Sequence, residues 1–442
     1  MNQRVYRVLL GLAIGDAYGV GFEFKTPKEI QHIFPSKVLK SLGGGPFNFL
    51  PGEFSDDTEM ALLTLYSLMH YQDLNVAHIK QLYTVWAHFA KDIGVQTQKA
   101  LFNNEINYEA QGNGALMRII PAVVYMHDVL GWDNTTIKHA IHSISIITHD
   151  VPIIHQVNDF FIDLVLEKEI EKHKAIMDDF LQTTGNSGWV VNTARIVYVT
   201  FLKKHLSLLD GMWEIISYGG DTDTACAIYA ALRICHDAQL LEVLHVNDFL
   251  NQEAQLVLHT FNTTCLHYYQ PDSIKYPHLY AGQYPGSKQI IFHVIKLSHL
   301  VDLGIECVVS LMEESESKRF TPYQNALLHV KHGIEFFQFP IQDMNIPSKS
   351  FCHTIMQTLE QLLTCNKKVY IHCWGGHGRT GVVVGSWLVL QGYHPKEALA
   401  QIKMQRMGTP FLNQPSPQTD EQVNFLYNIA NIAESKEKNG TK

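Results

Sequence analysis

The hydrophobic pattern of the chain changes near residue 270. Before that point, apolar residues recur at three- and four-residue spacing in the segments 60–70, 79–92, 137–149 and 224–238, which predicts helices. After about Pro277, the runs GIECVVSLM, GIEFFQFPI and KKVYIHCW are short and rich in β-branched and aromatic residues. Helix-like segments separate these runs, so βαβ units are expected. The chain is therefore predicted to join an all-α domain to an α/β domain.

The length of 442 residues fits this division, because one hydrophobic core rarely organises so long a chain. With 46% hydrophobic and 17% charged residues, the composition is that of a folded globular protein. A segment rich in Tyr, Pro and Gly, residues 266–289, separates the two patterns. We place the boundary within it and expect domains at 1–270 and 271–442.

Charge and cysteine usage restrict the cellular setting. The formal net charge of -9 argues against general binding to nucleic acid or to a membrane surface. Seven cysteines without a CxxC pair suit a reducing compartment, so we expect a cytoplasmic protein. The apolar run 8–14 stops at Asp16 and predicts a helix rather than a leader. We find no stretch apolar enough to span a bilayer, and the oligomeric state is left open.

Acidic residues concentrate in three segments, GLAIGDAYGVGFEF, GEFSDDTEMALL and YGGDTDTACAIY. One interpretation is helix capping, by Ser55, Asp56 or Asp57 and by Asp221, with Glu59 completing a capping box. A cap needs one oxygen, however, and SDDT and DTDT each supply several. Surplus carboxylates repel one another unless a cation lies between them. A ligand set of oxygen donors without sulfur or imidazole favours Mg²⁺, and the number of carboxylates would suit a pair of ions.

The motifs GLAIGDAYG, SDDTEM, QGNGALMR, ITHDVP and GGDTDT, in this order, closely resemble the ADP-ribosylglycohydrolase family over about residues 5–265. The resemblance implies an all-α fold with a dinuclear Mg²⁺ centre, Mn²⁺ being the alternative ion, at the base of an ADP-ribose cleft. The implied metal ligands are Ser55, Asp56, Asp57, Asp221, Asp223 and Thr224.

Further residues are assigned to the same cleft. The resemblance places Glu23 near the scissile bond, as acid or base, and His149 on the cleft wall. Gly112, Asn113 and Gly114 would let a ligand approach the backbone closely. The alternative for Gly112, Asn113 and Gly114 is a turn before a helix. The alternative for His149 is a residue at a helix C-terminus, where histidine is favourable.

The segment HCWGGHGRTG follows a strand-like run and precedes a helix-like one. A glycine-rich turn at such a junction directs several N–H groups at one point and binds anions. Arg379 adds a planar fork for phosphate oxygens, and this field favours Cys373 as a nucleophile. A plain buried cysteine in a turn is the weaker interpretation.

This pattern resembles the cysteine-dependent tyrosine and dual-specificity phosphatase superfamily over about residues 275–435. The resemblance makes Asp343 the general acid and Thr380 the hydroxyl that assists the thiolate, with Gln422 a weaker match to a water-positioning residue. The substrate-binding residues are Gly375, Gly376, His377 and Gly378. Three glycines leave the loop open, which allows a phosphorylated sugar or nucleotide as well as a phosphoprotein.

These observations predict a bifunctional hydrolase that cleaves ADP-ribosyl glycosidic bonds and phosphomonoesters. Expected partners are an ADP-ribosylated protein or nucleotide and a phosphorylated protein or small molecule. One alternative is successive processing of a phosphorylated ADP-ribose or nucleotide metabolite by the two domains. Another is that one domain only binds its ligand, but complete residue sets in both domains favour turnover.

Overall fold

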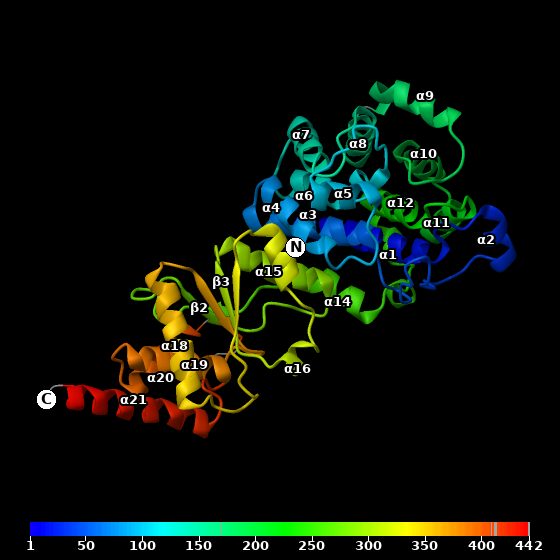
Figure 1. Ribbon diagram of the computed structural model, residues 1–442. Coiled ribbons are helices and arrows are strands. Elements are labelled where there is room, and N and C mark those ends of the chain that lie inside the picture. Colours follow the sequence, from blue (N-terminus) through cyan, green and yellow to red (C-terminus); the bar gives the residue numbers. More distant parts are fainter. Residues whose placement is uncertain (169, 408, 411–412, 441–442) are drawn as a thin grey trace. The chain divides into compact units, whose positions relative to one another are not determined.

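The computed structural model describes residues 1–168, 170–407, 409–410 and 413–440, and the chain divides into two compact units (Figure 1). Unit 1 is Met1–Thr263 and unit 2 is Thr264–Lys442. The division falls before the expected join near residue 270, because the strand β1 (Tyr268–Tyr269) pairs with β2 (Leu279–Gly282) inside unit 2.

Unit 1 is helical, as the sequence predicts. Its α-helices are α1 (Gln3–Gly19), α2 (Pro27–Ile33), α3 (Asp56–Tyr71), α4 (Val76–Ala87), α5 (Val95–Asn103), α6 (Ile120–Asp128), α7 (Asn134–Ser145), α8 (Pro152–Val165), α9 (Lys174–Gln182), α10 (Val190–Phe201), α11 (Leu208–Ser217), α12 (Thr222–His236), α13 (Val246–Phe249) and α14 (Gln252–Thr260). Short 3₁₀ turns are η1 (Val20–Phe22), η2 (Asn113–Ala115), η3 (Ile170–His173), η4 (Ala238–Leu241) and η5 (Phe261–Thr263).

Two predicted helices are shorter than the sequence pattern suggests. The segment 79–92 was expected to be helical throughout, but α4 ends at Ala87 and the chain then bends through residues 88–94. The segment 137–149 was also expected to be one helix, but α7 ends at Ser145 and leaves His149 beyond it. Apolar spacing continues past both helix ends because Phe89 and Ile93 are half-buried after α4 and Ile147 is buried after α7. Both extensions carry side chains into the site described below.

The centre of unit 1 is the contact between α1 and α12, which lie against one another along their length (Figure 1). Gly11, Gly15 and Gly19 recur at four-residue spacing and so share one face of α1. A Cβ atom on Gly15 would lie 2.2 Å from the carbonyl oxygen of Cys226 on α12. The glycines of the GLAIGDAYG motif therefore allow the two backbones to touch.

The same N-terminal segment is apolar enough to be tested as a membrane span. By length and composition, Gln3–Phe22 qualifies, with a mean hydropathy of 1.3, although we had found no such stretch in the sequence. Within the structure, 83% of its apolar window is buried inside the protein, as expected for the core helix of a globular domain.

Unit 2 contains the βαβ units that the sequence predicts. Its remaining strands are β3 (Cys307–Ser310), β4 (Glu335–Gln338) and β5 (Val369–His372). Its helices are α15 (Ile290–Asp302), α16 (Glu314–Ser317), α17 (Gln324–Val330), α18 (Lys349–Thr364), α19 (Arg379–Leu390), α20 (Pro395–Gln405) and α21 (Asp420–Gly440).

The sheet of unit 2 has the order β1-β2-β5-β3-β4, in which β1 alone is antiparallel to its neighbour. The helices α18 to α21 gather on one side of it (Figure 1). The strand β5 lies between β2 and β3, and all four of its residues are buried. Ligands of parallel sheets bind beyond the carboxyl ends of the strands. The loop after His372 occupies that position at the centre of the sheet.

We predict that Gly15→Ala lowers the stability of the chain by about 3 kcal/mol, because the added methyl group overlaps the α12 backbone, which cannot move aside easily. Urea unfolding would measure the loss. The matched control is Gly94→Ala, where the new methyl group would meet only the Thr97 hydroxyl, at 3.7 Å. Equal stability of the two variants would contradict the close helix contact.

Candidate functional sites

The acidic residues at the start of α3 and α12 do not cap these helices. Neither Ser55 nor Asp221, the residues at the two N-cap positions, makes a side-chain capping hydrogen bond. Instead, Asp16 on α1 accepts from the Ser55 N–H at 2.9 Å and from the Thr58 N–H at 3.1 Å. The Thr58 hydroxyl donates to Asp16 as well, at 2.6 Å. The capping interpretation was therefore wrong. The carboxylates of SDDT and DTDT do not stabilise the helix starts, so they need another explanation.

Residues from α3 and α12 meet in the core of unit 1. The hydroxyl groups of Ser55 and Thr224 both donate to the same oxygen of Asp57, each at 3.2 Å. The other carboxylate oxygen of Asp57 is buried without a hydrogen-bond partner, and so is one oxygen each of Asp223 and Glu23. Unpaired buried carboxylate oxygens are costly unless a cation or a ligand satisfies them.

The crowding of these carboxylates also raises their pKa values. Burial, followed by the charges of neighbouring acids, raises the pKa of Asp56, Asp57 and Asp223 well above the usual range. For Glu23, burial and then the charges of Asp92, Asp221 and Asp16 raise the pKa to about 8. A cation between the carboxylates would remove this repulsion.

Glu23 lies with two other acids at the cleft. Glu23, Asp92 and Asp223 can each place one oxygen within 4.8 Å of the others. Asp92 stands in the loop after α4, and burial followed by the charges of Asp16 and Asp221 raises its pKa to about 7. Asp92 could not be recognised as a site residue from the sequence, because the apolar spacing predicts a helix that extends to it. The polar pair Lys91 and Asp92, followed closely by Gly94, indicates in the sequence that the helix ends before residue 92.

These groups line a cleft of about 240 Å³. From the predicted set, the lining residues are Glu23, Asp56, Gly112, Asn113, Gly114, His149, Asp221, Asp223 and Thr224. Asn113 donates to Asp221 at 2.6 Å and so orients this carboxylate. Cβ atoms on Gly112 and Gly114 would lie 3.4 Å and 3.0 Å from the His149 ring, so both glycines make room for it. His149 is not a helix C-terminal residue, and burial, then Arg118, lowers its pKa to about 3.

The phosphate-type loop of unit 2 runs from Cys373 at the end of β5 to Arg379 at the start of α19. Cys373 is buried, and its sulfur accepts from the Gly376 N–H at 3.3 Å. Gly376 has a φ of +76°, and a Cβ there would lie 2.3 Å from Gly282. This position requires glycine on both grounds. The loop thus curls around the thiol, with the Gly376 N–H directed at it.

Arg379 is held beside the loop by acidic partners. Its guanidinium donates to both oxygens of Glu316, at 2.6 Å and 2.8 Å, and to the Ile341 carbonyl at 3.1 Å. Asp343, the predicted acid, lies 3.0 Å from the same guanidinium and is 55% exposed at its side chain. The sequence predicted Cys373, Arg379 and Asp343 as site residues but did not indicate Glu316. No local pattern marks this residue, since its partner is 63 positions away.

The remaining predicted residues of the loop lie around it. Thr380 is buried, and its hydroxyl has no hydrogen-bond partner in the described part of the chain. The His377 ring folds over Gly375, with Nδ1 2.9 Å from the Gly375 carbonyl. A Cβ on Gly378 would lie 2.9 Å from the Gln418 side chain. Gln422 donates to the Asn345 carbonyl at 3.0 Å, so it anchors the segment that carries Asp343.

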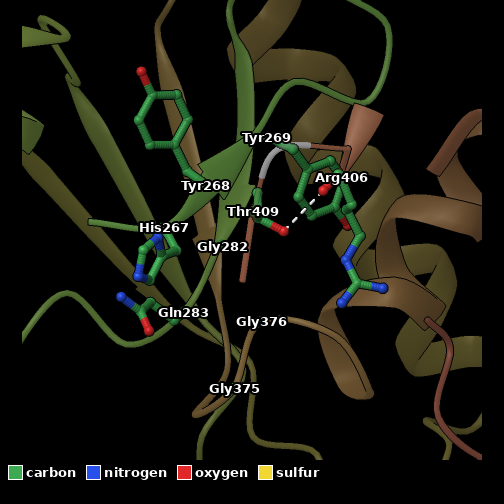
Figure 2. Close-up of a pocket in the computed structure, with 9 residues that line it drawn as sticks. All are labelled: His267, Tyr268, Tyr269, Gly282, Gln283, Gly375, Gly376, Arg406 and Thr409. Atoms are coloured by element: carbon green, nitrogen blue, oxygen red, sulfur yellow. Dashed lines mark hydrogen bonds between the residues drawn. The ribbon is translucent and has the colours of Figure 1, made fainter. Parts of the chain in front are cut away.

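Figure 2 shows the flank of the loop, where Gly375 and Gly376 face Tyr269 and Arg406. The cavity there has a volume of about 10 Å³. Such a space holds roughly one water molecule and no substrate group. This flank of the loop is therefore too small to hold a phosphate.

His372 supports the loop from below. Its Nδ1 lies 3.0 Å from the Cys373 carbonyl and can only donate to it, so Nε2 accepts from the Tyr323 hydroxyl at 2.7 Å. The neutral ring satisfies both contacts. Burial lowers the pKa of His372 to about 4. The hydrogen bond to the Cys373 carbonyl opposes this shift, and the positive charge of Arg379 adds to it.

Comparison with known proteins matches each of the two units to a family. A family model described as ADP-ribosylglycohydrolase matches residues 1–233, slightly more than half of the chain. The chain belongs to the ADP-ribosylglycohydrolase family. Residues 293–438 match the model of a "Swiss Army Knife protein, DSP-PTPase phosphatase domain". Both regions thus belong to hydrolase families, one fused to the other.

Curated relatives match one region or the other. "Putative ADP-ribosyl glycohydrolase L543" of Acanthamoeba polyphaga mimivirus is 27% identical over 284 residues, 52% of this chain and 85% of the relative. "Putative tyrosine phosphatase 197R" of Invertebrate iridescent virus 6 is 30% identical over 33% of this chain and 48% of the relative. "ADP-ribosylarginine hydrolase Tri1" of Pseudomonas putida is 30% identical over 32% of this chain and 42% of the relative. The chain spans less than half the length of the last two.

The ADP-ribosylglycohydrolase family generally depends on divalent metal. The unpartnered oxygens of Asp57, Asp223 and Glu23 fit this property, since they are oxygen donors that have no hydrogen-bond partner among the described residues.

We predict that His372 makes the stability of unit 2 depend on pH. The unfolded histidine binds a proton near pH 6.5, whereas the folded one does so only near pH 4, so stability is lost as pH falls through this window. The loss should approach about 3 kcal/mol by pH 4. Urea unfolding of residues 264–442 at pH 7 and pH 4.5 would measure it.

The His372→Gln variant should lose less stability than the wild type between these two pH values, because glutamine does not titrate. His293 is a second buried histidine of unit 2, and burial lowers its pKa to about 4, so His293→Gln serves as a matched comparison. Identical pH dependence of the wild type and His372→Gln would contradict the assignment.

Proposed function

We propose that the chain is a bifunctional hydrolase, in which unit 1 cleaves ADP-ribosyl glycosidic bonds and unit 2 cleaves phosphomonoesters. The observation that carries the first half is that Glu23 and Asp223, each with a buried carboxylate oxygen that has no hydrogen-bond partner, line one cleft together with Asp56, Asp92 and Asp221. The second half rests on Cys373 and Arg379 at the two ends of a glycine loop at the carboxyl end of the central strand.

The cleft of unit 1 would hold two Mg²⁺ ions, with Mn²⁺ as the alternative. The proposed ligands are Ser55, Asp56, Asp57, Asp221, Asp223 and Thr224. When bound, the metal supplies positive charge that neutralises these carboxylates and orients the ribose hydroxyl groups. Asp16 fixes the start of α3, and Asn113 orients Asp221, so the donor set is held in place before any ion arrives.

Glu23 is the proposed acid–base residue. Hydrolysis breaks the bond between ribose C1″ and the leaving atom, forms a bond from C1″ to a water oxygen, and transfers a proton to the leaving group. Glu23 can accept the proton from water or donate one to the leaving group, and burial, the largest cause of its raised pKa, favours the protonated form that donates. Asp92 beside it increases this effect by its charge. His149 stays neutral and lines the wall.

The loop of unit 2 would act in two steps. Its N–H groups and the Arg379 fork hold three phosphate oxygens while the Cys373 sulfur bonds to phosphorus and the ester oxygen leaves with a proton from Asp343. Water then bonds to phosphorus and displaces the sulfur while the Asp343 carboxylate takes a proton from it, which releases phosphate and restores the thiolate, with the Thr380 hydroxyl as its hydrogen-bond donor. Glu316 keeps the Arg379 guanidinium in the orientation that this grip needs.

The substrates follow from these chemistries. Unit 1 would act on ADP-ribose linked to a protein or a nucleic acid, and unit 2 on a phosphorylated protein or small molecule. The three glycines of the loop support a small-molecule substrate, because they add no side chains around the phosphate position. A reducing, cytoplasmic setting is also proposed, since all seven cysteines are free.

We predict that the two activities separate completely by mutation. Asp223→Ala should abolish ADP-ribose release and spare aryl phosphate hydrolysis, because the Asp223 carboxylate belongs to unit 1 alone. Cys373→Ser should do the reverse, because a serine hydroxyl is a far poorer nucleophile in this loop. Both rates are measured on the purified full chain, with circular dichroism as the control for folding.

Loss of both activities in either folded variant would contradict two separate sites. Full ADP-ribose release by Asp223→Ala at low Mg²⁺ would contradict the metal-ligand assignment.

A further inference from the structure

Arg118, in the segment before α6, carries a guanidinium group that is completely buried in unit 1. The group lies over the Tyr83 ring, with 4.8 Å between Cζ and the ring centroid. Its Nη2 donates to the Thr148 hydroxyl at 2.9 Å and to the Ile144 carbonyl at 3.2 Å. The reaction proposed for unit 1 gives this side chain no role. A buried charge is costly, so its presence here needs an explanation.

The contacts of Thr148 fix the direction of a chain of hydrogen bonds. Thr148 is fully buried, and its hydroxyl has two polar contacts among the described residues, Nη2 of Arg118 and Nδ1 of His149, each at 2.9 Å. Arginine can only donate, so the Thr148 oxygen accepts from Arg118. The single hydrogen of the hydroxyl is then left for Nδ1 of His149, which must accept it. Nδ1 therefore carries no proton.

The remaining proton of the His149 ring lies on Nε2. Burial, followed by the charge of Arg118, lowers the pKa of His149 to about 3, so the ring is neutral and holds one proton. His149 lines the cleft with Gly112 and Gly114, and a Cβ atom on Gly112 would lie 3.4 Å from Nε2. Among the residues that the structure describes, none forms a hydrogen bond with Nε2. This N–H is thus a donor kept for a ligand of the cleft.

We propose that Arg118 is a positioning residue that acts through Thr148: it directs the Thr148 hydroxyl at His149 and so keeps the ring proton on Nε2, as a donor to a substrate oxygen. This inference rests on the proposed function of unit 1. Threonine hydroxyls commonly donate to the carbonyl four residues earlier, which here is Ile144. Without Arg118, Thr148 could turn to that carbonyl and accept a proton from Nδ1. The lone pair of Nε2 would then face the substrate oxygen and repel it.

The test measures the tautomer of His149 by NMR of the full chain labelled with ¹⁵N-histidine. A protonated and an unprotonated ring nitrogen have well-separated shifts, and the loss of signals in His149→Asn assigns the ring. We expect the wild type to carry its proton on Nε2. Arg118→Met should move a substantial fraction of the protons to Nδ1. Arg118→Lys should restore the wild-type tautomer, because an ammonium group also only donates.

A second variant keeps the test decisive if Arg118→Met does not fold. Thr148→Val removes the hydroxyl with little change of shape and should also weaken the preference for Nε2, whereas Thr148→Ser should keep it. The matched control is Thr84→Val, at a buried threonine whose hydroxyl donates to the Lys80 carbonyl at 2.8 Å, outside the cleft. It should lower the Tm and leave the His149 tautomer unchanged.

Binding of free ADP-ribose to the metal-loaded full chain, measured by calorimetry, tests the donor itself. Arg118→Met and Thr148→Val should bind about 10-fold more weakly than the wild type, and Thr84→Val should bind equally well. A wild-type tautomer in the folded variants, with only a lower Tm, would show a purely structural role and overturn the proposal. Unchanged affinity despite a shifted tautomer would overturn it as well.

Failure of the proposed function gives a different result. If the wild type neither binds ADP-ribose nor releases it from a substrate, the glycohydrolase assignment falls. The tautomer measurement needs no ligand, so it then decides the role of Arg118 alone: a shift in Arg118→Met that Arg118→Lys reverses supports the positioning role, and an unchanged tautomer overturns it.

Discussion

The backbone contact between α1 and α12 at Gly15 organises unit 1, because it determines where the acidic residues can meet. Asp16, the next residue on α1, reaches across to hold the start of α3 through the Ser55 and Thr58 N–H groups. The start of α12 carries Asp221 and Asp223 to the same region. A side chain at Gly15 would separate the two helices and, with them, the two halves of the carboxylate set.

This packing creates an electrostatic problem that unit 1 does not solve by itself. Several carboxylates are buried together, their pKa values are raised, and oxygens of Asp57, Asp223 and Glu23 have no partner. Unit 2 solves the opposite problem internally: the buried guanidinium of Arg379 is neutralised by Glu316 and Asp343. A cation is therefore expected in unit 1, whereas the loop of unit 2 is ready for an anion that competes with its own acids.

The sequence predicted local chemistry better than distant contacts. Cys373 and Arg379 lie in one continuous loop between a strand and a helix, so their pairing could be read from ten residues. Glu316 could not, since it meets Arg379 only after the sheet has formed. Asp92 was missed because apolar spacing ran past the true end of α4, and the SDDT capping interpretation failed because Asp16, from another helix, takes that role. Fold class depended on periodicity and could be predicted; side-chain partners far apart in sequence could not.

We propose that divalent cations complete the carboxylate set of unit 1. Calorimetric titration of Mg²⁺ into the metal-free full chain, together with the Tm of the same samples, tests it directly. We expect saturable binding of two ions and a higher Tm, both lost when Asp57 and Asp223 are replaced by asparagine. Absence of binding, or binding that survives these replacements, would contradict the account.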